Sequence, residues 1–160
     1  TESDVEVIFE ITKAAFADHP YSNQTEQFIV NALRAAKALS ISLVAEIDGK
    51  VVGHIAFSPV AISDGNHNWY GLGPVSVLPA FQKRGVGKSL IHEGLSLLKA
   101  LGANGCVLVG DPKYYERFGF KSFPDLSIEG LPPENILALA FDNRIPHGEV
   151  IFHQAFSAKG

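Results

Sequence analysis

Residues 74–88 read PVSVLPAFQKRGVGK and join an apolar strand to a glycine-rich basic turn and then to an amphipathic helix. The valines at the start favour an extended backbone, and Pro79 cannot donate to a strand ladder, so the strand is predicted to end there. Gly85 and Gly87 let the chain turn tightly and bring its backbone close to a ligand.

The turn has the properties of an anion site. A helix predicted to start at Gly87 directs the free N–H groups and the positive dipole end of its first turn back into the loop. Lys83, Arg84 and Lys88 add positive charge to a chain whose formal net charge is −4. A Rossmann turn requires a third glycine where Leu90 stands, and a P-loop requires an earlier glycine than the chain provides. We therefore expect a phosphate site of another class.

Composition limits the function classes. With 160 residues, 46% hydrophobic and 19% charged, the chain predicts one globular domain and excludes a disordered protein. No apolar run is long enough to span a bilayer, and the acidic charge argues against nucleic acid or membranes as partners. The single Cys106 forms no internal disulfide, which predicts a cytoplasmic protein. Because the chain has no Met, we expect that a short segment preceding Thr1 is missing. The sequence leaves open whether the protein is a monomer or a homodimer.

Periodicity predicts an α/β chain with a mixed sheet. Capping patterns at Ser3–Glu6 and Asn23–Glu26 begin two helices, Asp111-Pro112 is the N-cap and first residue of a short one, and Asp48-Gly49 marks a hairpin. The expected helices cover about 4–17, 23–39, 87–101 and 112–118, and the expected strands cover 41–47, 50–62, 69–78, 106–109, 136–141 and 149–156. The expected buried stripes of the first three helices are Ile8, Ile11, Ala15 and Phe16, then Phe28, Ile29, Ala32 and Leu33, then Leu90, Ile91, Leu95, Leu98 and Leu101. The passage 72–109 is a right-handed crossover between parallel strands.

Two motifs carry a family resemblance. Gln82–Gly87 matches the pattern Q/R-x-x-G-x-G/A after a strand, and Tyr115–Phe120 matches Y-E-x-x-G-F after the next strand. The chain thus resembles the GNAT superfamily of acetyl-CoA-dependent N-acetyltransferases, and the run GDPKYYERFGF is similar to a bacterial subgroup of predicted acetyltransferases. The resemblance implies one GNAT domain over 1–160, with helices on both faces of a mixed sheet and a V-shaped splay between two parallel central strands. It also implies that the first strand of the fold precedes residue 1.

The resemblance further implies the site. Backbone N–H groups of Gln82, Lys83, Arg84, Gly85, Val86 and Gly87 would hold the pyrophosphate of coenzyme A beside Lys88, and Val75, Ser76 and Val77 would pair with its pantetheine arm. The Val77 N–H would stabilise the oxyanion, and Tyr115 would protonate the departing thiolate as general acid. The implied reaction moves acetyl from acetyl-CoA directly to a primary amine in a ternary complex, without a metal. The acceptor is a small-molecule or protein amine.

Some assignments stay open at this stage. The general base is Glu46, His54, Asp111 or water, and a GNAT-fold module that binds CoA without transfer is the alternative function. Asp18, Asp142 and Glu149 either border the acceptor or are solvated loop charges. Cys106 is interpreted as a small buried hydrophobe rather than a nucleophile, and Tyr114 as a packing residue.

Overall fold

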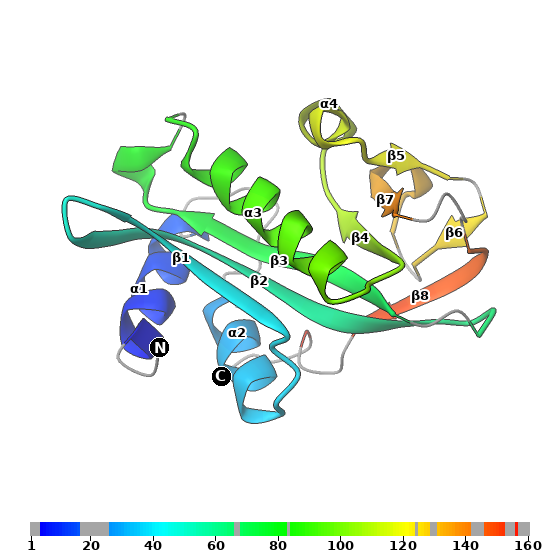
Figure 1. The fold of residues 1–160 in the computed structure, drawn as a ribbon, viewed down its shortest axis with the longest axis horizontal. Coiled ribbons are helices and arrows are strands. Elements are labelled where there is room, and N and C mark those ends of the chain that lie inside the picture. Colours follow the sequence, from blue (N-terminus) through cyan, green and yellow to red (C-terminus); the bar gives the residue numbers. More distant parts are fainter. Residues whose placement is uncertain are drawn as a thin grey trace. The chain divides into compact units, whose positions relative to one another are not determined.

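The computed structural model describes residues 4–16, 26–65, 68–82, 84–123, 125–128, 131–141, 146–152 and 156 (Figure 1). Its helices are α1 (Val5–Phe16), α2 (Glu26–Ala35), α3 (Val86–Ala100) and α4 (Pro112–Tyr115), with short 3-10 turns η2 (Pro79–Phe81), η3 (Glu116–Phe118) and η4 (Pro133–Asn135). The strands are β1 (Ile41–Ile47), β2 (Lys50–Ile62), β3 (Trp69–Val77), β4 (Gly105–Val109), β5 (Lys121–Ser122), β6 (Leu126–Ser127), β7 (Ile136–Ala140) and β8 (Gly148–Phe152). The predicted order is confirmed, and β5 and β6 are additional.

The strands form a mixed sheet in the order β5-β7-β4-β3-β2-β8-β6, with β1 paired to β2 off this path. β1 and β2 are antiparallel across the Asp48-Gly49 turn, where both residues have positive φ (52° and 79°) as a two-residue hairpin requires. β3 and β4 are parallel, which confirms the predicted crossover through α3. The ladder between them joins Trp69–Gly71 to Gly105–Val107, whereas β3 itself continues to Val77. β3 therefore continues beyond its ladder with β4, as expected of two strands that splay apart.

The chain divides into two compact units. Unit 1 contains residues 1–58, 73–94 and 154–160, and unit 2 contains residues 59–72 and 95–153. β2, β3 and α3 each contribute residues to both units.

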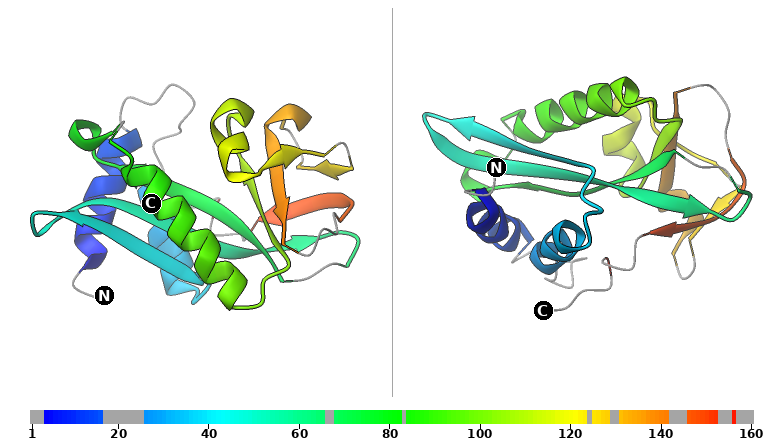
Figure 2. Two further views of the ribbon diagram at one scale, coloured as in Figure 1. Left: turned by 45° about the horizontal axis from the view of Figure 1, so that its top comes forward. Right: turned by 60° about the horizontal axis from the view of Figure 1, so that its bottom comes forward.

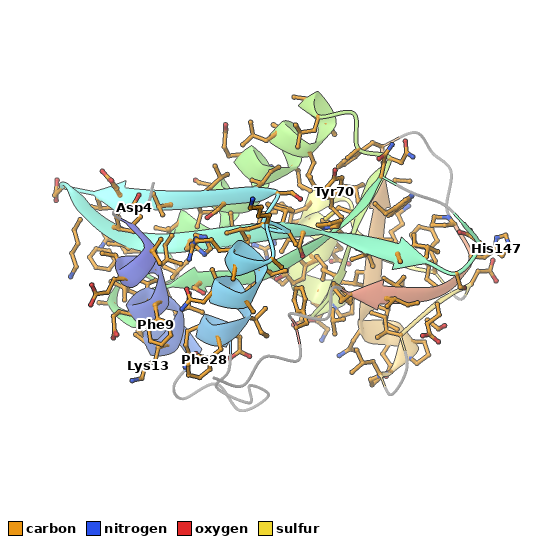
Figure 3. The ribbon with its side chains drawn as sticks, turned by 90° about the horizontal axis from the view of Figure 1, so that it is seen from below. Asp4, Phe9, Lys13, Phe28, Tyr70 and His147 are labelled. Carbon is orange, nitrogen blue, oxygen red and sulfur yellow. The ribbon has the colours of Figure 1, made fainter. Side chains whose placement is uncertain are left out.

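In unit 1, α1 and α2 cover one face of the β1–β2 hairpin, and the first turns of α3 cover the other (Figure 2). The two covering helices meet through Phe9 and Phe28, whose ring centroids are 5.6 Å apart in an edge-to-face arrangement (Figure 3). On the opposite face, a Cβ added at Gly53 would lie 3.0 Å from Val86 Cγ1 and 3.2 Å from Leu90 Cδ1. The small residue in β2 therefore allows α3 to approach closely.

In unit 2, the core gathers around β4. Gly105, Cys106, Val107 and Leu108 are all buried, so both faces of this strand are covered as its continuous apolar sequence predicts. The buried cluster beside it consists of Val60, Ile62, Trp69, Val107, Leu126, Ile136, Ala138 and Val150. The loop that follows β4 after Val109 starts from this core.

Two helix ends differ from the sequence prediction. α2 ends at Ala35 rather than near residue 39, because Lys37 adopts a left-handed conformation (φ 57°) and the Ala38 N–H donates to the Leu33 carbonyl. This is the hydrogen-bonded helix end that glycine usually supplies, and here no glycine marks it. α3 ends at Ala100, and Leu101, predicted to be buried, is 62% exposed.

The predicted helix stripes are otherwise largely found. Ile8 and Ile11 in α1 and Leu33 in α2 are buried, and so are Leu90, Ile91, Leu95 and Leu98 in α3. Ala15, Ala32 and Phe28 are only half-buried, whereas Gln27 and Val30 are buried although the predicted stripe omits them. The proposed caps Ser3 and Asn23 and the side chain of Phe16 lie outside the described residues.

Candidate active site

The glycine turn connects β3 to α3 in unit 1. After η2 the chain is extended at Gln82, and Gly85 has φ 82° with an exposed backbone. The helix begins at Val86, and the Ser89 N–H is bonded to the Gly85 carbonyl at 3.0 Å. Helix geometry leaves the N–H groups of Val86, Gly87 and Lys88 without an intrahelical acceptor. The predicted helix end after the glycine turn is thus present, one residue earlier than expected, and its role in binding an anion stays a prediction.

Gln82 braces this turn. Its side-chain Nε2 donates to the Val77 carbonyl at 3.0 Å, and its own N–H donates to the Pro79 carbonyl at 3.4 Å. The side chain therefore ties the end of β3 to the loop that leads into α3. Among the predicted pyrophosphate donors, the Gln82 N–H thus already has an acceptor inside the turn. Lys83 lies outside the described residues.

Two cations flank the ring of Phe81. Arg84 Cζ lies 5.2 Å and Lys50 Nζ lies 5.9 Å from the ring centroid, both within the range of a cation–π interaction. Lys50 comes from the start of β2, so the fold adds to the basic turn a positive charge that its sequence does not contain. Lys88 on the first turn of α3 is exposed.

At the end of β3, backbone N–H and C=O groups of alternate residues face toward β2 and away from it. The Leu78 N–H donates to the Val52 carbonyl at 2.8 Å, so this residue faces β2. The Ser76 carbonyl also faces β2, because it lies 3.2 Å from where a Gly53 Cβ would be. Successive residues of a strand direct their backbone groups to opposite sides, so the N–H groups of Val75 and Val77 face away from β2. Among the three predicted pantetheine partners, these two have backbone groups directed outward.

Tyr115 lies at the end of α4 in unit 2, within an aromatic cluster. Its ring centroid is 4.9 Å from that of Tyr114, 6.1 Å from that of Phe120 and 6.3 Å from that of Phe118. Burial, and secondarily the nearby Tyr114 and Cys106, raise the pKa of Tyr115 to about 12. The phenol therefore keeps its proton at neutral pH and can donate it.

Asp111 caps the helix that carries Tyr115. Its Oδ1 accepts a hydrogen bond of 2.9 Å from the Lys113 N–H, and Pro112 occupies the first helical position, as predicted. Gly119, with φ 95°, ends the following 3-10 turn. A carboxylate engaged in a cap has a structural role, which accounts for this aspartate without a catalytic function.

The other two candidate bases lie in the β1–β2 hairpin of unit 1. His54 is fully buried, its Nε2 lies 2.7 Å from Ser42 Oγ, and burial together with the Arg34 charge lowers its pKa to about 4. The imidazole is therefore neutral at pH 7 but has no exposed surface from which to take a proton from a substrate. Glu46 is exposed on β1.

The remaining predicted residues have packing or surface positions. Cys106 is fully buried in β4 and burial raises the pKa of its thiol, as expected of a small core residue rather than a nucleophile. Arg117 Cζ lies 4.7 Å from the Tyr114 ring centroid. Glu149 is exposed, and its N–H donates to Ser63 Oγ. Asp18 and Asp142 lie outside the described residues.

The described part of the chain contains no cluster of three or more His, Cys, Asp or Glu side chains that could hold a metal ion. None of the helices described there is long and apolar enough to cross a membrane.

Comparison with known proteins gives concordant matches. The sequence profile of the Acetyltransferase (GNAT) family matches residues 6–120. A crystal structure of a GNAT family acetyltransferase from Brucella melitensis, in complex with acetyl-CoA, is 53% identical and has a TM-score of 0.87, covering 98% of this chain and 94% of that one. The crystal structure of YhbS from Escherichia coli, in complex with CoA, is 30% identical with a TM-score of 0.83, covering 96% and 89%.

A curated relative is similar over a shorter range. The E. coli K12 protein described as an uncharacterised N-acetyltransferase, YhbS, is 36% identical over 102 residues, which are 63% of this chain and 61% of that protein. The match thus spans about three fifths of the length of the curated relative.

Proposed function

The chain belongs to the acetyltransferase (GNAT) family, and on that premise we propose that it transfers the acetyl group of acetyl-CoA to a primary amine. The two solved relatives that contain acetyl-CoA and CoA support the same cosubstrate here. The observation that carries the proposal is the backbone of residues 75–82 and 84–88. On β3 it has N–H groups that face away from β2, and after the hydrogen bond from Gln82 to Val77 it has a helix end with free N–H donors.

The turn holds the pyrophosphate. The N–H groups of Val86, Gly87 and Lys88 point toward the ligand at the positive end of α3, and Gly85 leaves space for the phosphates. The Lys88 side chain adds charge, and Arg84 can reach the same anion by leaving the Phe81 ring. Charge therefore assists a site that is built mainly from backbone.

Val75 and Val77 hold the acyl arm. Their outward backbone groups pair with the amides of pantetheine as an added strand does. The Val77 N–H is the donor to the thioester carbonyl oxygen and to the oxyanion that forms when the amine attacks. Gln82 holds the carbonyl of the same residue and so orients this peptide.

Tyr115 completes the transfer. As the carbon–sulfur bond breaks, its hydroxyl gives a proton to the thiolate. The attacking nitrogen releases its second proton, which through water restores the phenol, and the products are an amide and the CoA thiol. The amine first loses its proton to water, an assignment supported by the burial of His54 and by the capping role of Asp111. Direct attack in a ternary complex needs no enzyme-bound acyl group, since the thioester is already activated.

The acceptor is a small-molecule or protein amine, and the protein acts in the cytoplasm. A screen of primary amines with acetyl-CoA, in which release of the CoA thiol is measured, tests the reaction directly. Turnover with at least one amine is expected. Binding of acetyl-CoA without turnover across the screen would favour the alternative, a module that binds CoA without transferring acetyl.

Thermal denaturation tests the cosubstrate. At a ligand concentration 100 times Kd, binding stabilises a protein by about 2.7 kcal/mol, which raises the Tm of a chain of this size by roughly 5–10 °C. Acetyl-CoA and CoA are expected to give this shift, whereas NAD and ATP are not. Equal shifts from all four ligands would contradict a CoA-specific site.

A further inference from the structure

We propose that Gly110 is a positioning residue for the transfer reaction. Because Gly110 has no side chain, the Tyr115 ring can pack directly against its backbone, and this contact fixes the position of the Tyr115 hydroxyl. The inference rests on the proposed role of Tyr115 as general acid. Gly110 directly follows β4, and Tyr115 ends the helix after it, so both belong to unit 2.

The contact is close. A Cβ at Gly110 would lie 2.6 Å from Tyr115 Cε2, 3.0 Å from Tyr115 Cδ2 and 3.1 Å from Leu108 Cδ1. Carbon atoms that are not bonded attract best at about 3.5–4.0 Å, so the first of these distances is a clash. The φ of Gly110 lies outside the left-handed region, so its backbone would accept any residue. Glycine is required here for space and not for conformation.

The backbone side of this contact is fixed. The Gly110 N–H donates to the Asn135 carbonyl at 2.9 Å, which ties the end of β4 to η4. Leu108, two residues before, is buried at 1% exposure and cannot easily yield. An added methyl group would therefore have to be accommodated by movement of the tyrosine ring.

The other sides of the ring are also occupied. Tyr114 lies edge-on at 4.9 Å and Phe120, itself 1% exposed, lies at 6.1 Å. The Asp111 cap fixes the start of α4 and hence the direction in which Tyr115 leaves the backbone. The ring thus rests between Gly110 and aromatic neighbours. A group placed at Gly110 would displace the hydroxyl along with the ring, and a misplacement of about 1 Å can reduce a rate by roughly a hundredfold.

The test is a double-mutant cycle in kcat. Gly110→Ala is expected to lower kcat about 10- to 100-fold while the KM for acetyl-CoA stays within about twofold, because the phosphate and pantetheine contacts come from residues 75–88. In the Tyr115→Phe background the hydroxyl is already absent, so Gly110→Ala should lower kcat no further. An equal loss in both backgrounds would overturn the proposal.

Gly71→Ala is the matched control. Its Cβ would lie 2.5 Å from Phe152 Cε1, 3.0 Å from Phe152 Cδ1 and 3.1 Å from Val60 Cγ1, nearly the same set of distances in the same unit. It should lower the Tm as Gly110→Ala does and leave kcat nearly unchanged at a temperature where both variants are folded. A similar fall in kcat for both variants would mean that general destabilisation is responsible, against the proposal.

The position of the ring can be measured without activity. With ¹³C-labelled tyrosine, the Tyr115 Cζ signal, assigned by its loss in Tyr115→Phe, should shift in Gly110→Ala and not in Gly71→Ala. If Tyr115→Phe retained full turnover, the general-acid assignment would fail, but a shifted Tyr115 Cζ signal in Gly110→Ala would still show that Gly110 positions the ring. An unchanged Cζ signal in Gly110→Ala would refute the positioning role, whatever the kinetics.

If Gly110→Ala alone does not fold, Tyr115→Leu removes the ring atoms that an added Cβ at residue 110 would meet. The double variant Gly110→Ala/Tyr115→Leu should then have the same Tm as Tyr115→Leu alone. A lower Tm of the double variant would mean that the added methyl group clashes with another residue, and it would refute the contact between Gly110 and the Tyr115 ring.

Discussion

At the residue scale, Tyr115 combines a protonated hydroxyl with a fixed ring. Its raised pKa of about 12 means that the phenol remains a proton donor throughout the range in which an amine acceptor becomes deprotonated. Raising the pH should therefore increase the supply of free amine without consuming the acid. The neighbouring Tyr114 is the same residue type in different surroundings, because Arg117 lies over its ring.

Tyr115→Phe is expected to lower kcat by about 10²–10⁴-fold, the usual contribution of a positioned acid, with little change in the Kd of acetyl-CoA. Steady-state kinetics and calorimetric titration measure the two effects. Tyr114→Phe, which removes the adjacent hydroxyl, should retain near-normal kcat. Full activity in Tyr115→Phe would exclude this residue as the acid.

His54 shows a second consequence of environment. Its pKa is lowered from 6.5 to about 4, so folding favours the neutral ring. The resulting stability is fully present above pH 6.5 and is lost as the pH falls through 4. A shift of this size corresponds to about 3 kcal/mol between those limits.

Replacing His54 by Gln should therefore flatten the fall in unfolding free energy between pH 6.5 and pH 4, as measured by urea denaturation. His92→Gln, at an exposed position of α3, should retain the steep wild-type dependence. If His54→Gln and wild type lost stability in parallel, another group would have to account for the acid sensitivity.

At the element scale, the junction of β3 and α3 carries most of the proposed site. Its order follows from short-range chemistry: Pro79 ends pairing, Gln82 closes the loop onto Val77, and Gly85 turns the chain into the helix. The same kind of chemistry predicts the Asp48-Gly49 hairpin and the Asp111 cap. It does not predict where α2 ends, because Lys37 adopts a conformation that its side chain does not favour.

Gly85 can be tested against Gly102, which lies two residues after the end of α3. Both have positive φ, 82° and 84°, and at both an added Cβ meets nothing within 4 Å. Alanine at either position should cost about 1–2 kcal/mol of folding free energy through backbone strain. Only Gly85→Ala is expected to weaken acetyl-CoA as well, by roughly tenfold in Kd. Equal Kd values for the two variants would argue against a phosphate site at Gly85.

At the scale of the whole molecule, the two compact units share secondary-structure elements. β2, β3 and α3 pass through both, so neither unit has a complete set of elements of its own. We therefore expect the protein to unfold in one cooperative transition, consistent with a single domain. Differential scanning calorimetry should give a calorimetric enthalpy equal to the van't Hoff enthalpy. Two resolved transitions would show that the units fold separately.

Local sequence patterns predicted the order of elements, the parallel crossover, the glycine turn and the helix that carries Tyr115, because each depends on residues close together in the chain. The roles of residues whose neighbours are distant in the chain became apparent from the packing of the elements. This packing buried His54 within the influence of the Arg34 charge and brought Lys50 to the ring of Phe81. It also set Gly110 against Tyr115. Burial and close contact depend on how elements pack, and local sequence patterns do not specify that packing.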